Sequence, residues 1–461
     1  MFPSQTSLIP VTIALTRFLT EFGAKAWGMN YPYWYLGSTP FKFLIGPVFP
    51  LLISLVHKLL PAMSLFSLAI CTVISSLFLS ALGWGILVNK VSESRKAGLA
   101  MGILLLFLPF RFLAALAFDE ASMTIAKSSL PFVLIACWFF LKKFNLKHFL
   151  IGTGAVSALL LVNTNILPIL LVGLVCLALV SSYQAGKFRH LWRYFKRLLV
   201  VVGCSLLIVT FWYSPGFWLV ILTNPSIGGA SSIKVIFRVL DLAKAAIPLV
   251  LALGAVYFSP KAKSRLAIFT WTWILTFLFL TAFRFIGDPD FWSDWTSWFF
   301  ELEIGIALVI VQNRKYWLMI VLPFIAVFLL YRALGKPRLI VNQIPEGVAS
   351  IVDLNRIAGK NLVFCSGTTV FWLNAFYDTP QVRGGRDEVS LNKDWLKTAY
   401  ALRESQDAEI IKKNLESTKV RYVLVHSENS KEYYHDFKNT TVWDTVGKLY
   451  WTGGDDVIYS E

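Results

Sequence analysis

Carboxylates and an arginine gather in one short polar stretch late in the apolar part of the chain, where Asp288, Asp290 and Asp294 follow Arg284. Carboxylate oxygens at this spacing could hold a hard divalent cation such as Mg²⁺ or Mn²⁺, and the neighbouring indole rings could stack on a sugar. An interfacial tryptophan belt around a solvated acidic turn is the simpler interpretation. The stretch therefore gives candidate metal ligands, Asp288 and Asp290, and a candidate substrate contact, Arg284. Its tryptophans are Trp292, Trp295 and Trp298.

Two further pairs of acidic residues border apolar runs. Asp119 and Glu120 stand between two such runs, where an acidic group is costly enough to suggest function, although a solvated loop is the alternative. Glu301 and Glu303 open a later run, where acidic residues suit the start of a helix. Because they are two residues apart they lie on different faces, so we expect at most one to point into a cavity. Glu301 is the candidate substrate contact.

Three basic residues are candidate contacts for an anion. Lys42 follows an aromatic segment, and Arg238 shares a predicted helix face with Lys234. Arg383 precedes Gly384–Gly385, whose lack of side chains would let the backbone approach a ligand closely. Anchoring to lipid headgroups is the commoner explanation for the first two residues, and an ordinary docking loop is the alternative for the third.

The composition is that of a polytopic α-helical membrane protein. Hydrophobic residues make up 56% of the 461 residues, and the mean hydropathy is +0.62, well above a soluble globule. The apolar runs predict about ten transmembrane helices, several near the short end of the roughly 17–25 residues that a bilayer requires. Such segments must be helical, because lipid cannot satisfy backbone polar groups. Pro109 and Pro131 are predicted to kink these helices rather than end them.

Basic residues cluster in alternate gaps between the apolar runs, and this pattern sets the orientation. Loops rich in Lys and Arg stay in the cytoplasm, which places the acidic stretches outside. The formal net charge of +16 belongs to the membrane part, because residues 336–461 contain 16 Lys+Arg against 17 Asp+Glu. Orientation and anionic lipid explain this excess, so we expect membrane lipid and no nucleic acid as a partner. The inner clusters are Lys90/Arg95/Lys96, Lys142/Lys143/Lys147, Lys187–Arg197, Lys261–Arg265 and Arg314/Lys315.

The chain divides into three parts. Residues 1–63 are predicted to form an extracytoplasmic loop with interfacial helices. Because they carry no spanning run, we expect a first membrane helix upstream of Met1 or a chain that is a fragment. Residues 64–335 form the transmembrane bundle, and residues 336–461 a small extracytoplasmic α/β domain. Its predicted strands are 361–365, 420–426 and 456–459, and its predicted helices are 395–404 and 407–417.

Several common catalytic motifs are missing from the sequence. It contains no Gly-Xaa-Ser-Xaa-Gly elbow, no HExxH pair and no CxxC, which argues against a membrane protease, a hydrolase or a redox enzyme. The five cysteines form neither a disulfide framework nor a zinc pattern.

Three stretches carry a resemblance to a known family. They are the aromatic segment 33–43, Phe118-Asp-Glu-Ala-Ser with Leu130-Pro-Phe, and Phe371-Trp-Leu-Asn through Pro380-Gln-Val-Arg-Gly-Gly. With the order of the parts, they resemble the GT-C superfamily of membrane glycosyltransferases. More closely, they are similar to the bacterial and archaeal membrane proteins labelled "6-pyruvoyl-tetrahydropterin synthase-related". The pterin enzyme uses zinc held by histidines, whereas the five histidines of this chain are scattered.

The resemblance implies a glycosyltransferase in the plasma (inner) membrane. Such an enzyme would move a sugar from a polyprenyl-phosphate carrier to a glycan, lipid or protein acceptor on the outer face, with a divalent metal as a possible cofactor. Asp119 and Glu120 would be catalytic. The acidic residue that the family places after its first membrane helix has no match here, and Glu21 is the nearest acid. A glycolipid-binding protein without catalysis, or a transporter, is the alternative.

Overall fold

The structure, a computed structural model, forms two compact units. Residues 1–70 and 338–461 make up the first unit, and residues 71–337 make up the second. We call them the two-ended unit and the helical unit. The described residues are 8–116, 121–186, 188–223, 240, 243–244, 246–259, 264–286, 295–315, 317–334, 343–392 and 394–461.

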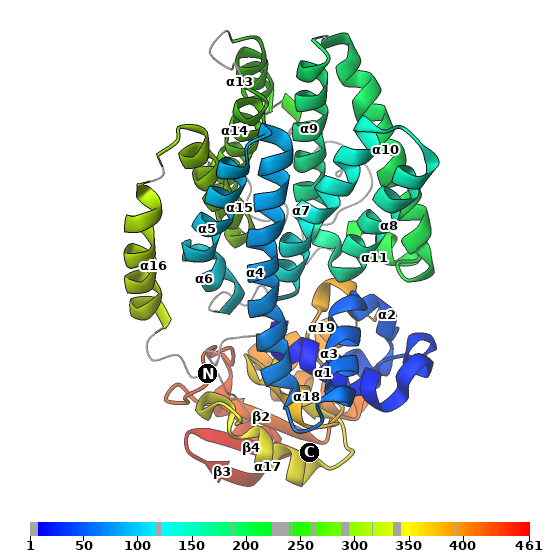
Figure 1. Cartoon of the computed structure of the whole chain (residues 1–461). Helices are drawn as coiled ribbons and strands as arrows, with labels where there is room; N and C mark the ends of the chain where they lie inside the picture. Colours follow the sequence, from blue (N-terminus) through cyan, green and yellow to red (C-terminus); the bar gives the residue numbers. More distant parts are fainter. Residues whose placement is uncertain are drawn as a thin grey trace. The chain divides into compact units, whose positions relative to one another are not determined.

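In the described ranges, the helical unit consists of α-helices and short 3-10 turns (Figure 1). Neighbouring helices pack pairwise, with α7 on α8 and α14 on both α9 and α15. Indole rings fill the interior, where Trp84 meets Trp273 edge to face at 5.0 Å. The helices are α4 Leu65–Ser92, α5 Arg95–Phe107, α6 Phe110–Leu116, α7 Ala121–Lys142, α8 Leu146–Val162, α9 Leu167–Gln184, α10 Leu191–Ile208, α11 Pro215–Thr223, α13 Ile247–Phe258, α14 Arg265–Ile286, α15 Trp295–Gln312 and α16 Leu318–Leu334, with 3-10 turns Thr164–Ile166, Phe188–His190 and Val209–Phe211.

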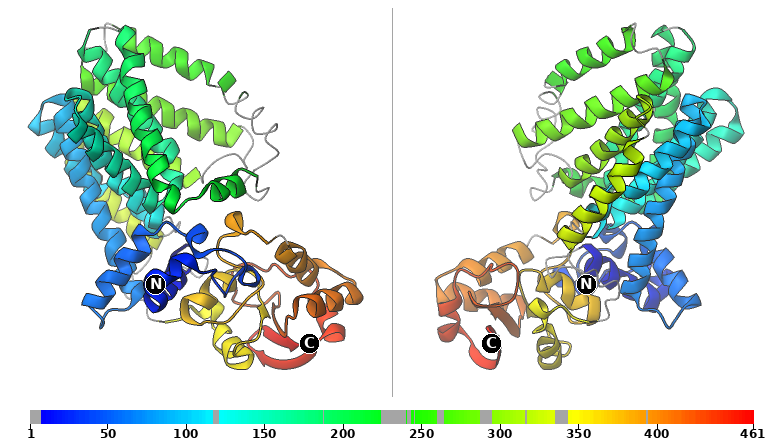
Figure 2. Two further views of the ribbon diagram at one scale, coloured as in Figure 1. Left: turned by 90° about the vertical axis from the view of Figure 1, so that its right-hand side faces the viewer. Right: turned by 60° about the vertical axis from the view of Figure 1, so that its left-hand side comes forward.

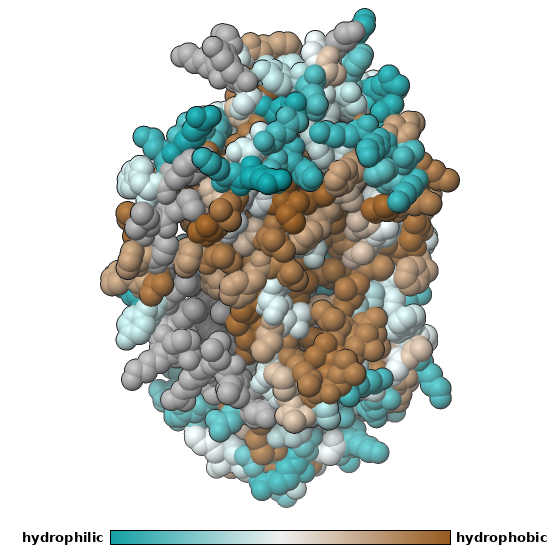
Figure 3. All heavy atoms as spheres, in the orientation of Figure 1, coloured by the Kyte–Doolittle hydropathy of each residue, from teal (hydrophilic) through white to brown (hydrophobic). Residues whose placement is uncertain are grey.

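Membrane character is confirmed by the lengths of these helices. Five of those in the described ranges are long and apolar enough to cross a bilayer. The visible face of this unit is largely hydrophobic, and hydrophilic residues gather at the end where α4 finishes and α5 begins (Figure 3). The prediction of about ten crossings stays a prediction. The five spans are Leu65–Ser92, Ala121–Lys142, Thr164–Gln184, Phe188–Phe211 and Arg265–Ala282.

The two prolines expected to kink helices behave differently. Pro131 lies within α7, which continues past it to Lys142. Pro109 instead separates two helices, because α5 ends at Phe107 and α6 begins at Phe110. The prediction for Pro109 is therefore wrong. The residue before a proline is biased towards extended backbone, and Leu108 adopts it with φ −77° and ψ 123°.

Within the described residues, the two-ended unit contains a four-stranded mixed sheet in the order β1-β2-β4-β3. Its last strands are the red ones beside the C-terminus in Figure 2. Strand β1 pairs with β2 in parallel, and β4 pairs antiparallel with both β2 and β3. The strands are β1 Val363–Phe364, β2 Tyr422–His426, β3 Lys448–Gly453 and β4 Asp456–Ser460; the helices beside them are α17 Ile351–Ala358, α18 Thr369–Phe376, α19 Asp394–Glu404, α20 Ala408–Thr418 and α21 Trp443–Val446, with 3-10 turns Glu346–Val348, Asp387–Val389 and Thr440–Val442.

The N-terminal elements pack directly against this sheet domain. Helix α1 contacts α18, and the buried Trp34 donates a hydrogen bond from Nε1 to Asn374 Oδ1 at 2.9 Å. The backbone N–H of Gln381 donates to the carbonyl of Tyr33 at 2.9 Å. Segments more than 300 residues apart in sequence therefore share one core. The N-terminal elements are α1 Leu8–Phe22, α2 Phe41–Leu44, α3 Val48–Leu59 and 3-10 turns Gly23–Gly28 and Tyr35–Gly37.

Candidate functional site

A break between α5 and α6 concentrates charged side chains inside the helical unit. The Glu303 carboxylate accepts hydrogen bonds from the backbone N–H groups of Phe110 at 2.8 Å and of Arg111 at 3.1 Å. The Arg111 guanidinium donates to the carbonyl of Leu105 at 2.8 Å and to that of Leu77 at 3.3 Å. A helix end inside an apolar bundle leaves backbone groups without partners, and these two side chains supply them. Glu303 and Arg111 therefore stabilise the break.

Two further charged residues are buried in the same unit. Lys127 on α7 and Glu301 on α15 are both fully buried. The Lys127 ammonium lies 4.5 Å from the centre of the Phe300 ring, a cation–π distance, and the Arg111 guanidinium lies 5.4 Å from the same ring. Glu301 and Glu303 both interact electrostatically with Arg111. We call Arg111, Lys127, Glu301 and Glu303 the charge cluster.

The charge cluster lies at a consistent depth along three helices. Along each helix, roughly 13–15 residues separate the level of the cluster from the basic residue at the predicted cytoplasmic end. At 1.5 Å per residue this is about 20 Å along the helix axis. A hydrocarbon core is about 30 Å thick, so this depth falls in the outer third of the core if the inner ends are cytoplasmic. The residue pairs that give this spacing are Leu77–Lys90 on α4, Lys127–Lys142 on α7 and Glu301–Arg314 at α15.

Glu301 is the one predicted site residue in the charge cluster. Glu301 and Glu303 are both buried, and the expectation that at most one of them points into a cavity stays a prediction. Their different faces meet different neighbours, and Glu303 is turned towards α6. Sequence reasoning also missed Arg111 and Lys127. A charge inside an apolar run was the signal that could have found them.

The other predicted site residues of the membrane part are described only in part. Asp119, Glu120, Arg238, Asp288 and Asp290 lie outside the described residues. The backbone of Arg284 belongs to α14. Lys42 is half-exposed in the short helix α2. In the part of the chain that the structure describes, no group of three or more His, Cys, Asp or Glu residues could hold a metal ion.

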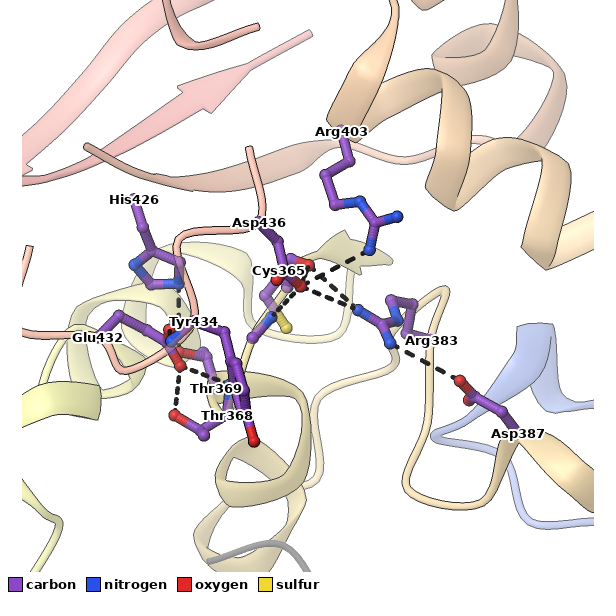
Figure 4. Close-up of polar contacts among 12 residues, drawn as sticks. Cys365, Thr368, Thr369, Arg383, Asp387, Arg403, His426, Glu432, Tyr434 and Asp436 are labelled. Carbon is purple, nitrogen blue, oxygen red and sulfur yellow. Dashed lines mark hydrogen bonds and ion pairs between the residues drawn. The ribbon is translucent and has the colours of Figure 1, made fainter. Parts of the chain in front are cut away.

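Arg383, the last predicted contact, lies in a polar network of the two-ended unit (Figure 4). Its guanidinium donates to Ser366 Oγ at 3.1 Å and lies 3.6 Å from carboxylate oxygens of both Asp387 and Asp436. Arg403 lies 3.6 Å from the same oxygen of Asp436 and pairs with Glu404. Asp436 thus holds two guanidinium groups close together.

Asp387 is held between this network and the N-terminal aromatic turn. Its carboxylate accepts a hydrogen bond from the Tyr35 hydroxyl at 2.9 Å, and that hydroxyl accepts one from the backbone N–H of Arg386 at 2.7 Å. Burial raises the pKa of Asp387, while Arg383 and the Tyr35 hydroxyl oppose the rise. The carboxyl is therefore coupled to both Arg383 and the aromatic turn.

Gly384 and Gly385 do approach a partner closely, but the partner belongs to the chain itself. A Cβ on Gly385 would lie 2.3 Å from a methyl of Val11, and a Cβ on Gly384 would lie 2.6 Å from the Tyr35 ring and 2.7 Å from Trp34. The space predicted for a ligand is filled by the N-terminal aromatic turn. These glycines serve packing within the two-ended unit.

Another network in this unit looks catalytic but is closed to substrate. His426 Nδ1 lies 2.9 Å from Asp456 Oδ1, and its Nε2 lies 3.2 Å from Thr369 Oγ1. This order of acid, imidazole and hydroxyl resembles a nucleophile activated by a base. Thr369 and His426 are buried, however, with at most 1% of their surface exposed. We interpret the arrangement as a satisfied core histidine.

Comparisons with known proteins identify similar solved structures only. No protein-family model matches the chain, and no curated protein matches it. Two crystal structures of the Archaeoglobus fulgidus oligosaccharyltransferase are similar to it, each at 12% sequence identity and over 91% of this chain. The form tethered with an acceptor peptide containing the NVT sequon gives a TM-score of 0.49, and the apo form gives 0.48. The chain spans only 65% and 66% of the length of those chains.

Proposed function

We propose that this protein is a GT-C-type glycosyltransferase of the plasma membrane. It would take a sugar from a polyprenyl-phosphate carrier and pass it to a glycan, lipid or protein acceptor on the outer face. The observation that carries the proposal is the charge cluster, above all Lys127 and Glu301, which are fully buried among apolar helices. A charged residue inside a membrane helix is costly to insert, so such groups usually mark a functional site.

Lys127 suits a lipid phosphate by its charge and its depth, and because it is fully buried, the helices around it must part before a phosphate can reach it. An ammonium in the outer third of the membrane can meet a headgroup phosphate while the polyprenyl tail lies in lipid. Phe300 supports the ammonium through its ring face without neutralising its charge. Arg111, engaged with the two backbone carbonyls, adds positive potential near the same ring.

The transfer itself needs a base and a stabilised leaving group. The acceptor hydroxyl attacks the anomeric carbon and forms the new glycosidic bond, and the bond from that carbon to the phosphate oxygen breaks. The hydroxyl proton goes to Asp119 or Glu120, and the phosphate keeps the bonding electron pair. Lys127 stabilises the charge that develops on this phosphate. Both acids precede Lys127 by about two helical turns in sequence, which motivates their assignment.

The test is sugar transfer by membranes that contain the protein and variants at Lys127. With a radiolabelled sugar on a polyprenyl-phosphate donor, we expect Lys127→Gln to reduce transfer by about 100-fold or more, because one stabilising charge is lost. Lys127→Arg keeps the charge and should retain more activity than Lys127→Gln. Asp119→Asn with Glu120→Gln should abolish transfer.

The matched control is Lys142→Gln at the other end of the same helix. Lys142 also lies over an aromatic ring, with its ammonium 4.8 Å from the centre of Trp138. This variant should change transfer less than about twofold. Equal transfer by the Lys127→Gln and Lys142→Gln proteins, at equal amounts in the membrane, would remove Lys127 from the mechanism. No transfer by the unaltered protein with any of several donors would favour the binding or transport alternative.

A further inference from the structure

The two-ended unit contains a pocket that the proposed transfer reaction does not use. It lies between helix α19 and the turn that carries Arg383, and its volume is about 500 Å³. Small-molecule sites usually have volumes of roughly 300–1,000 Å³, so this pocket could hold one or two sugar rings. The pocket is lined by Arg383, Asp387, Trp395, Leu396, Lys397, Ala399, Tyr400 and Arg403.

Three cations and one carboxylate line this pocket, and the two arginines also pair with Asp436 and Glu404 outside the lining. Arg383 and Arg403 are 16% and 27% exposed, so both guanidinium groups are partly accessible. Asp436 holds them together from behind through contacts of 3.6 Å, which are ion pairs rather than short hydrogen bonds. Lys397 adds a third, exposed cation.

Both guanidinium groups also retain unused donor capacity, although Arg403 donates one hydrogen bond to Glu404. Arg383 makes one hydrogen bond, to Ser366, although a guanidinium carries five N–H donors. The Nε atoms of Arg383 and Arg403 are buried and have no hydrogen-bond partner among the described residues. Buried donors in native structures are normally paired, and an oxyanion entering the pocket could draw these groups into bidentate contacts.

Aromatic surface lies beside these cations. Trp395 is buried and contacts Tyr35 at 5.2 Å between ring centres, which fixes the inner wall of the pocket. Tyr400 and Leu396 are exposed by 61% and 53%, although they line the pocket. An exposed aromatic ring next to paired arginines is suited to stacking on a sugar whose charged group reaches the guanidinium groups.

We propose that this pocket binds a sugar that carries an oxyanion. The carboxylate of a uronic acid or the phosphate of a sugar phosphate would be held by Arg383, Arg403 and Lys397, and the ring would lie against Tyr400. The proposal rests on the proposed function only in treating this sugar as part of a glycan substrate. A binding measurement tests the pocket without requiring any transfer.

The experiment is ligand-observed NMR on the purified full chain in detergent micelles. The probes are glucuronic acid, glucose 6-phosphate, glucose and acetate. We expect one or both of the anionic sugars to bind. Glucose and acetate should each bind at least about tenfold more weakly, because glucose lacks the oxyanion and acetate lacks the sugar ring. The comparison of the two anionic sugars identifies which oxyanion the pocket prefers.

Three variants test the named residues. Arg383→Gln should weaken binding of the anionic sugar about tenfold or more, because it removes a charged hydrogen-bonding partner. Lys397→Gln, on the surface of α19, should weaken it several-fold without disturbing the fold. Lys412→Gln is the matched control, since it removes the same charge from the neighbouring helix α20, where Lys412 faces Glu409 at 3.7 Å.

The binding results test the pocket independently of whether the protein transfers sugar. Binding of anionic sugar that weakens in Lys397→Gln but not in Lys412→Gln supports the pocket, even if no transfer is ever detected. Equal binding of glucose, equal binding of acetate, or no binding of either anionic sugar would overturn it. Loss of binding to the same degree in both lysine variants would also overturn it, because general charge rather than the pocket would then be responsible.

Discussion

Glu432 illustrates how one buried residue can organise a region of the fold. Its carboxylate accepts hydrogen bonds from the backbone N–H and hydroxyl of Thr368 and from the N–H of Tyr434. Acidic groups are stabilised at the start of a helix, and Thr368 directly precedes α18. The carboxylate therefore links the start of α18 to the segment that follows β2.

Gly367 leaves the space in which this carboxylate sits. Its φ is +69°, and a Cβ would lie 2.6 Å from the Glu432 carboxyl group. We expect Gly367→Ala to lower the free energy of unfolding by roughly 2–5 kcal/mol, from left-handed backbone strain and from overpacking. Gly454→Ala is the control, because φ is +61° there but the space is open. Thermal and denaturant unfolding followed by tryptophan fluorescence would compare them, and equal losses in the two variants would contradict the steric part of this explanation.

Individual site residues were only partly predictable from the sequence. Arg383 was identifiable because a basic residue beside two glycines suggests a binding turn. That Trp34 would occupy the space beside those glycines could not be foreseen, since the two segments are far apart in sequence. Lys127 was overlooked because one lysine in an apolar run carries no information on its depth or its neighbours until Phe300 is placed beside it.

At the scale of elements, the break at Pro109 depends on the partners of two helix ends. Glu303 accepts from the first N–H groups of α6. Arg111 donates to the Leu105 carbonyl in the last turn of α5 and to the Leu77 carbonyl within α4. Neither helix end could be left unsatisfied in an apolar environment. Opposite charges on α6 and α15 thus connect four helices, α4, α5, α6 and α15, around the break.

This interpretation predicts a large loss of stability for Glu303→Leu. The substitution leaves two N–H groups without an acceptor and removes one of the two carboxylates that interact with Arg111, which should cost about 3–5 kcal/mol. Glu303→Gln keeps an acceptor oxygen and should lose less. The measurement is the melting temperature of the detergent-solubilised protein, which Glu303→Leu should lower more than Glu303→Gln. A melting temperature for Glu303→Leu equal to that of the unaltered protein would show that the backbone groups find other partners.

The local sequence patterns predicted where strands form better than they predicted where the strands end or which strands pair. Strands were expected at 420–426 and 456–459, and β2 and β4 lie there, because their alternating β-branched and aromatic residues are strong strand signals. Strand β3 was missed, since its mostly exposed residues give no alternating pattern. The predicted strand 361–365 is reduced to Val363–Phe364, where pairing with β2 decides its length.

At the scale of the whole molecule, the alternating basic loops predict the sidedness of each unit. We expect a cysteine at Lys412 to react with a membrane-impermeant maleimide in intact cells, in a background with Cys71 and Cys204 replaced. A cysteine at Lys143, in the exposed loop between α7 and α8, should react only after the membrane is permeabilised, because basic loops remain inside. The opposite labelling pattern would invert the topology and place the two-ended unit in the cytoplasm.

The two-ended unit also has a consequence for biosynthesis. The hydrogen bond from Trp34 to Asn374 joins residues 340 positions apart. At a synthesis rate of about 5–20 residues per second, roughly 20–70 s pass between the emergence of the two partners, while the helical unit is being made. During this delay the aromatic rings of residues 31–43 have no core to enter. Ribosome stalling anywhere within residues 71–337 would prolong this exposure, so the supply of charged tRNA for the membrane helices would influence the yield of folded protein.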